Sequence, residues 1–286
     1  MGKKKKSNVW MIPVYAILII WALSTIYPLI WVMLNSFKVK NEIIANSFSL
    51  PVGELFTWAN YKRAFDRVPI LGAYVNSLLV SGMVTVVVML LAGLASFALV
   101  RYNFKGKNFL MSVVVGSMMF PAFATIVPVF RMEAAWGIVN TSNRWLSLIS
   151  CALPQIAGNL SFAIIVLSGY IRSLPVDLEE AAYIEGCSVP KIFFKIVVPL
   201  AKPSFATVAI FSFLWSYNDL FTQTFFLRYP TQWAITRLLK ELTAMEGTNY
   251  GLMASAVTIV VVPVIILYVF LQKYIIKGMT AGAIKG

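Results

Sequence analysis

The chain has 286 residues, of which 59% are hydrophobic and only 12% are charged, and its mean hydropathy is +0.80. A soluble domain carries about twice that share of charge. Here the charges lie in short stretches between long apolar runs, as in integral membrane proteins. The formal net charge of +13 would also suit a nucleic-acid-binding protein. Because the positive charge lies mostly between the apolar runs, we attribute it to membrane topology and expect no nucleic-acid partner.

The N-terminal segment, residues 1–11, contains four consecutive lysines, Lys3 to Lys6, and precedes an apolar run. This run, residues 12–34, is too long for the apolar region of a signal peptide, and no small-residue cleavage site follows it. We therefore predict a basic cytoplasmic N-terminus and an uncleaved first transmembrane helix.

Six apolar stretches are each long enough to cross about 30 Å of hydrocarbon as a helix. They cover residues 12–34, 74–100, 109–130, 146–170, 203–220 and 252–271. Several contain proline, which transmembrane helices tolerate because neighbouring helices satisfy the freed carbonyl groups. Small residues, Gly82, Ala92, Gly93, Ala95 and Ser96, give the second stretch a face for close helix packing. The pattern predicts an all-α membrane protein with six transmembrane helices.

The orientation follows from the distribution of Lys and Arg. If the N-terminus is cytoplasmic, the inner segments hold 14 of the 24 basic residues, and the longer outer segments hold 10. This bias predicts that both termini are cytoplasmic. Lys38 and Lys40 are among the outer basic residues that oppose it.

The inner segment from Arg172 to Lys202 is too long for a simple turn. Pro175 can begin a helix, and the acidic residues that follow, including Glu180, favour the positive end of its dipole. Ala181 and Ala182 are strong helix formers with little bulk, and Gly186 can end the helix in a left-handed conformation. A second amphipathic helix follows. A small, acidic tip of this kind is typical of a loop that inserts into a groove of a partner.

This segment resembles the EAA motif of binding-protein-dependent ABC importers. The matching residues are Glu180, Ala181, Ala182, Gly186, Ile196 and Pro199. Glu185, Cys187 and Val198 depart mildly from the usual residues. In that family the loop is the coupling helix, which docks into a cleft of the cytoplasmic ATPase.

Other stretches resemble the second, six-span permease subunit of maltose-type sugar importers. They are Asn60-Tyr61, Asn76-Ser77, Trp215 to Asp219 and the C-terminal residues 278–286. The resemblance implies a type I ABC importer permease fold with its core over 71–271, a cytoplasmic tail over 272–286, and the bacterial cell membrane (plasma or inner membrane) as the location. It implies a homologous permease, two ATPase subunits, an extracytoplasmic sugar-binding protein and membrane lipid as partners. It also places most sugar contacts in the partner permease.

Three groups of residues are further candidates for function. Asn76, Asn218 and Asp219 are candidates for the translocation path or gate; Asp219 alternatively forms a solvated helix end or a salt bridge to the companion permease. The resemblance implies that the outer loop over 221–251 enters the binding protein, with Tyr229, Pro230, Thr231, Gln232 and Trp233 as contact candidates. It also implies that the tail runs between the ATPase subunits, with Lys285 as a contact candidate.

The chain lacks a phosphate-binding loop, since the residues around Gly106-Lys107 do not fit that motif. We therefore expect no ATPase activity in this chain, and ATP and Mg²⁺ to bind the partner ATPase. Without histidine, a Ser-His-Asp triad is impossible and a transition-metal site is not expected. The alternatives are an ABC permease for another solute, a secondary transporter or a membrane scaffold. A secondary transporter would usually carry ionisable groups at mid-membrane.

Overall fold

The computed structural model describes residues 11–247 and 249–283, and every regular element in these residues is helical. Four helices are long and apolar enough to cross a membrane, or six if each of two sharply bent helix pairs forms one span. The predicted all-α membrane fold is therefore confirmed. The chain forms two compact units, one from residues up to 68 with 241–262 and one from 69–240 with the residues from 263 on.

The first unit begins with α1 (Met11–Asn35), which is apolar on all sides and exposed along nearly its whole length. Three short helices follow: α2 (Lys40–Ala45), the 3₁₀ helix η1 (Gly53–Leu55) and α3 (Ala59–Arg67). The amide of Asn60 donates to the carbonyls of Ser36 and Lys38, at 2.9 and 2.8 Å. The same amide packs on Gly251 of α14 so closely that a Cβ there would lie 2.7 Å from Asn60 Nδ2. Asn60 thus holds the loop after α1 together.

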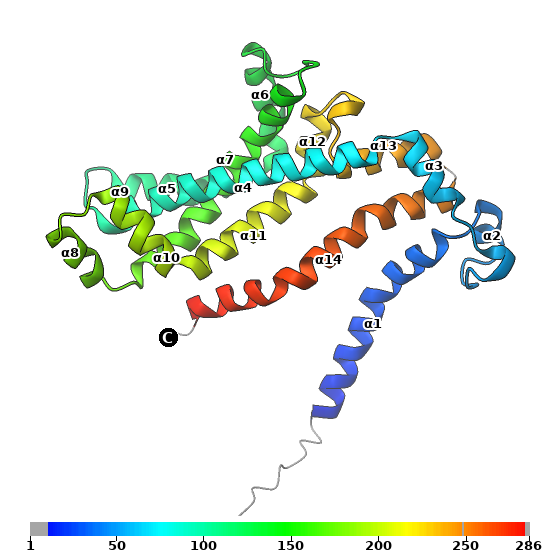
Figure 1. Cartoon of the computed structure of the whole chain (residues 1–286), viewed down its shortest axis with the longest axis horizontal. Coiled ribbons are helices and arrows are strands. Elements are labelled where there is room, and N and C mark those ends of the chain that lie inside the picture. Colours follow the sequence, from blue (N-terminus) through cyan, green and yellow to red (C-terminus); the bar gives the residue numbers. More distant parts are fainter. Residues whose placement is uncertain (1–10, 248, 284–286) are drawn as a thin grey trace, which may run out of the picture. The chain divides into compact units, whose positions relative to one another are not determined.

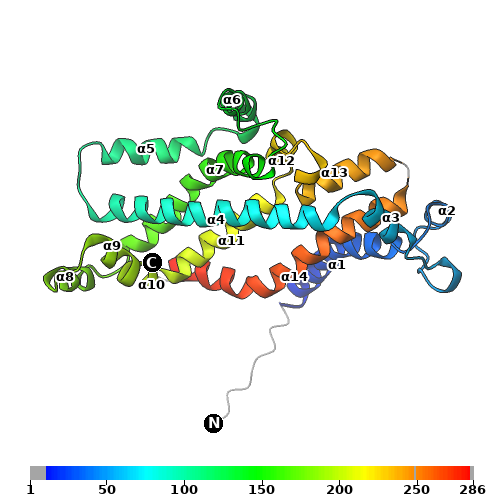
Figure 2. The same ribbon diagram turned by 45° about the horizontal axis from the view of Figure 1, so that its top comes forward.

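The second unit is built on α4 (Ile70–Arg101), α7 (Arg144–Arg172) and α11 (Lys202–Asn218), which pack on one another (Figures 1 and 2). The small-residue face predicted on α4 is present at this contact. A Cβ on Gly93 would meet the rings of Phe205 at 2.9 Å and Phe193 at 3.1 Å. Ala92 and Ser96 are fully buried beside it. Small side chains therefore set the helix spacing here.

The third predicted span is not one continuous helix. It consists of α5 (Lys107–Ser117) and α6 (Ala122–Ala135), whose axes meet at 105°. Pro121 lies at the break with extended backbone. Proline donates no hydrogen bond and disfavours helical backbone in the residue before it, so the helix ends before Phe120. Pro28, Pro128, Pro154 and Pro263 lie inside helices, as the sequence predicts.

The loop after α7 forms α8 (Asp177–Ile184), α9 (Val189–Ile192), a π-helical turn η2 (Phe193–Val197) and α10 (Val198–Leu200). After an 83° bend at Ala201, α11 begins. The remaining elements are α12 (Leu220–Phe226), the 3₁₀ helix η3 (Pro230–Gln232), α13 (Ile235–Glu246) and α14 (Tyr250–Ala283).

The last helix, α14, extends beyond the predicted span end at Leu271 as far as Ala283. The predicted cytoplasmic tail over 272–286 thus begins as a continuation of α14 as far as Ala283. Extending an existing helix adds a hydrogen bond for each residue without a new nucleation step, so this small-residue segment needs no core of its own. Lys285 lies outside the described residues.

Candidate functional site

The loop that resembles the EAA motif folds as two short helices joined by a glycine turn, at one end of α4 and α7 (Figure 1). Gly186 has φ = +76°, as predicted for a left-handed cap. The amides of Gly186 and Cys187 donate to the carbonyls of Tyr183 and Ala182, at 3.0 and 2.9 Å. These two bonds form a Schellman motif, which satisfies the last carbonyls of α8 and turns the chain into α9.

An ion pair fixes α8 to the end of α4. Arg101, the last residue of α4, places Nη2 2.8 Å from Glu179 Oε1 and donates from Nε to both carboxylate oxygens, at 2.9 and 3.1 Å. It also donates to the carbonyl of Leu174 at 3.2 Å. Both side chains are about 10% exposed. Burial, and to a lesser extent the Tyr183 hydroxyl, raises the pKa of the neighbouring Tyr102, so that this phenol stays neutral.

The second helix of the loop is held by buried apolar residues. Ile192, Phe193 and Val197 are at most 2% exposed, and the ring of Phe193 lies 5.5 Å from that of Phe97 on α4. Ile196 is half-buried and Pro199 is exposed. The loop is thus attached to α4 through both of its helices, by the Arg101–Glu179 ion pair and by the contact of Phe193 with Phe97.

The tip of the loop is accessible. Glu180, Ala181 and Gly186 are exposed, and Ala182 is half-buried. Four large apolar side chains on α8 and at its N-cap are 41 to 87% exposed: Val176, Leu178, Tyr183 and Ile184. We call these four residues the tip patch. An exposed apolar patch next to charged residues is typical of a protein contact. Neither Arg101 nor the tip patch was predicted from the sequence.

The path and gate candidates lie in three different environments. Asn76 is 1% exposed; it donates to the carbonyls of Thr231 and Trp233 and accepts from Arg144 Nε at 2.8 Å. Asn218 is exposed and donates to Leu214 of its own helix. Asp219 caps α12 by accepting from the amide of Thr222 at 2.9 Å. Among the described residues no hydrogen bond joins these three, and the side chain of Asn76 is engaged in buried contacts within the second unit.

The segment predicted to contact a binding protein is only partly accessible. Tyr229, Pro230 and Thr231 are exposed, whereas Gln232 and Trp233 are buried. The amide of Gln232 donates to the carbonyl of Thr141 at 2.8 Å. Because the side chains of Gln232 and Trp233 are buried within the second unit, only Tyr229, Pro230 and Thr231 present side chains to a partner.

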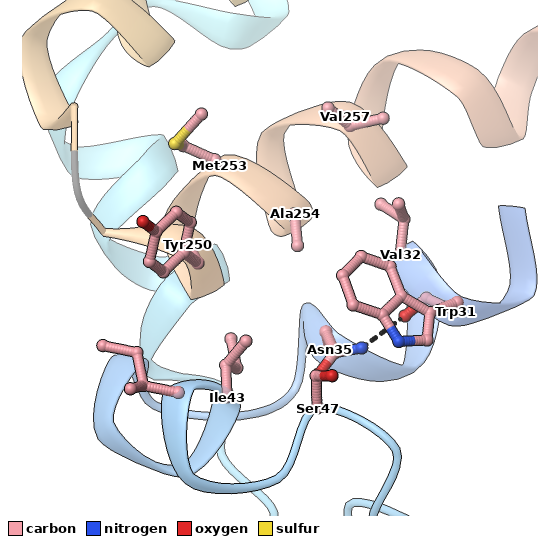
Figure 3. A pocket seen from close by; sticks show the side chains of 10 residues that line it. Trp31, Val32, Asn35, Ile43, Ser47, Tyr250, Met253, Ala254 and Val257 are labelled. Atoms are coloured by element: carbon pink, nitrogen blue, oxygen red, sulfur yellow. Dashed lines mark hydrogen bonds between the residues drawn. The ribbon is translucent and has the colours of Figure 1, made fainter. Parts of the chain in front are cut away.

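A cavity of about 390 Å³ lies within the first unit, between α1, α2 and the start of α14 (Figure 3). Most of its lining is apolar, and Trp31, Val32, Ile43, Met253 and Val257 contribute to it. Asn35 uses its amide nitrogen to donate to Trp31 O, as the dashed line in Figure 3 shows. Since so few polar groups line this cavity, we do not assign it to a sugar.

Comparison with known proteins gives concordant matches. Residues 89–281 match the family described as "Binding-protein-dependent transport system inner membrane component". The chain is 31% identical to the diacetylchitobiose uptake system permease protein NgcG of Streptomyces coelicolor, over 95% of this chain and 88% of the relative. It is 29% identical to the galactooligosaccharides transport system permease protein GanQ of Bacillus subtilis, over 95% of this chain and 94% of that relative.

The fold is that of a solved importer subunit. A chain of a bacterial ABC transporter involved in the import of the acidic polysaccharide alginate superposes with a TM-score of 0.78, over 96% of this chain and 99% of that chain, at 24% identity. The predicted permease fold is therefore confirmed. From the family match and its coverage, the chain is a multi-pass membrane protein that belongs to the binding-protein-dependent transport system inner membrane components.

Proposed function

We propose that this chain is one of two membrane-spanning permease subunits of an ATP-driven importer of oligosaccharides, and that it couples to a separate ATPase through the loop over 172–202. The observation that carries the proposal is the construction of that loop. Its tip exposes the apolar tip patch beside the acidic Glu180, while its base is held by the Arg101–Glu179 ion pair and by buried Phe193. The carbohydrate names of both curated relatives support the substrate class.

The proposed mechanism follows from this rigid attachment. A homologous permease supplies the other half of the translocation path. One ATPase subunit binds the corresponding loop of each permease, and in this chain it contacts the tip patch. When the ATPases close on ATP, they draw the two loops together. Because each loop is fixed to its helices, the helices turn from an inward-facing to an outward-facing arrangement. A binding protein that prefers the outward-facing state must, by linkage, also favour ATPase closure.

The experiment is uptake by the complex reconstituted in liposomes with the permease, ATPase and binding protein encoded beside this chain. We expect import of at least one oligosaccharide from a set of diacetylchitobiose, a galactooligosaccharide and maltotriose. Import should stop with vanadate and should persist with a protonophore at constant ATP. If a protonophore abolished uptake at constant ATP, the chain would instead be a proton-coupled carrier. Import of only non-carbohydrate solutes would contradict the substrate class.

Gly186→Val tests the assignment of the loop. A β-branched residue is strained at φ = +76°, so α9 should be misdirected. We expect assembly with the partner permease but loss of ATPase stimulation by the loaded binding protein. Gly137→Val is the matched control, since Gly137 has φ = +72° and an equally open surrounding but lies outside this loop. Normal stimulation in Gly186→Val would refute the coupling assignment.

A further inference from the structure

The break between α5 and α6 opens onto a second cavity, of about 450 Å³, within the second unit. Residues of the break, such as Ser117 and Phe120, form one wall, and α7 forms another. Gly158, which also lines the cavity, is the middle residue of α7. Non-helical backbone at membrane depth is tolerated where it is buried in protein or lines a water-filled cavity. The break lines this cavity beside the middle of α7, as that rule requires.

Aromatic side chains form one side of this cavity. The rings of Phe162 and Trp215 lie 4.9 Å apart at 62°, and Phe211 supports Trp215 from 5.9 Å. These contacts fix the indole while 47% of Trp215 remains exposed. A held, half-exposed indole offers a flat apolar surface, which suits the C–H face of a pyranose ring.

Hydroxyl groups lie among the other lining residues. The hydroxyls of Ser117 at the end of α5 and Ser161 on α7 are hydrogen-bonded to each other. Thr125 and Thr222 also line the cavity. Small-molecule sites combine an apolar lining with a few polar groups that fix the orientation of the ligand, within about 300–1,000 Å³. This cavity has that combination, unlike the mainly apolar cavity of the first unit.

We infer that this cavity is a sugar subsite of the translocation path, in which Trp215 stacks on a pyranose ring while hydroxyls from α5, α6 and α7 hold the sugar hydroxyls. The inference rests on the proposed function and deepens it. It assigns sugar contacts to this chain, whereas the resemblance to maltose-type importers places most of them in the partner permease. It also assigns a role to the break at Pro121, because the flanking residues Phe120 and Ala122 line the cavity together with Gly158.

The first test replaces the stacking surface in the reconstituted complex, with the sugar from the set above that the wild-type complex imports. We expect Trp215→Ala to lower the sugar imported per ATP hydrolysed by about two- to tenfold, the range of one aromatic contact. Hydrolysis stimulated by the loaded binding protein should remain, because the coupling loop is intact. Trp215→Phe should recover most import. Trp145→Ala is the control, because Trp145 is 57% exposed on α7 but lies outside the cavity.

The second test fills the cavity. A Cβ on Gly158 would meet no atom within 4 Å, and the same holds for Gly169 on the same helix, outside the cavity. We expect Gly158→Leu to block import while the complex assembles, and Gly169→Leu to import normally. Loss of the partner permease from purified Gly158→Leu would overturn the inference and make this surface a subunit contact.

Wild-type import per ATP in both Trp215→Ala and Gly158→Leu would also overturn the subsite, and would leave the proposed function standing. Failure of the wild-type complex to import any sugar of the set would overturn the proposed function and the subsite together. The two failures are therefore distinguishable.

Discussion

At the scale of single residues, the adjacent carboxylates Glu179 and Glu180 have different environments. Glu179 points back to Arg101 and is 8% exposed, whereas Glu180 is exposed at the tip of the loop. A pair with about 10% exposure on each side is shielded from solvent, so removal of one partner leaves the other charge buried without compensation. The matching motif residue, Glu180, is thus free for a partner because Glu179 supplies the internal contact.

Removal of the arginine tests this division. Arg101→Leu should lower the free energy of unfolding by about 3 kcal/mol if Glu179 stays charged, and should reduce ATPase stimulation, because α8 loses its attachment. Thermal unfolding and hydrolysis of the purified complex measure the two effects. The charge-swapped variant Arg101→Glu with Glu179→Arg should recover part of both. Glu180→Gln is the control for stability and should leave the unfolding midpoint unchanged. If this variant lowered the midpoint as much as Arg101→Leu does, the assignment of the internal contact to Glu179 alone would be contradicted.

The sequence predicted residues whose signal is local and missed those whose partners are distant. Gly186 was predictable because a glycine after a run of helix formers is itself the signal of a left-handed cap. The contact between Arg101 and Glu179 could not be predicted, because 77 intervening residues separate them and no local sequence signal links the two. Lys38 illustrates the same limit. It counted against the positive-inside bias, yet it is fully buried and donates to Ser49 Oγ at 3.0 Å and to the carbonyl of Asn46.

At the scale of elements, the spans were predictable because apolar length is a strong signal, but their interruptions were not. Five prolines lie well inside apolar stretches, Pro28, Pro121, Pro128, Pro154 and Pro263, and of these only Pro121 lies at a helix break, of 105°. The outcome depends on whether neighbouring elements satisfy the freed backbone groups, which is a tertiary property. The cavity beside the break could not be predicted for the same reason.

The contact between α4 and the second helix of the coupling loop gives an element-scale prediction. Gly93→Val should destabilise the protein by about 1–3 kcal/mol through overpacking, since its Cβ would meet Phe205 and Phe193 at 2.9 and 3.1 Å. It should also blunt ATPase stimulation, because Phe193 belongs to the loop. Gly82→Val is matched to it on the same helix, where a Cβ meets nothing within 4 Å. Equal unfolding midpoints for the two variants would show that Gly93 does not set this spacing.

At the scale of the whole molecule, the structure sharpens the argument from charge. The raw difference between 14 inner and 10 outer basic residues is modest. Several basic residues of the outer segments, however, have partners in the described part of the chain. Lys38 is buried, where desolvation lowers its pKa; Arg144 donates to Asn76; and Arg228 lies 5.1 Å from the ring of Phe130. These residues have structural reasons for their charge, so they weigh less as signals of topology.

We therefore predict that the coupling loop is cytoplasmic and that the opposite end of α7 is extracytoplasmic. Ser142 and Ser173 bracket α7 (Arg144–Arg172), and both are exposed. In a Cys187→Ser background, a membrane-impermeant maleimide should label Ser142→Cys in intact spheroplasts and Ser173→Cys only after permeabilisation. Cys151 is 0% exposed and should remain unlabelled in both conditions. The reverse pattern would place the tip patch outside the cell, where no cytoplasmic ATPase could reach it, and would contradict both the orientation and the proposed coupling.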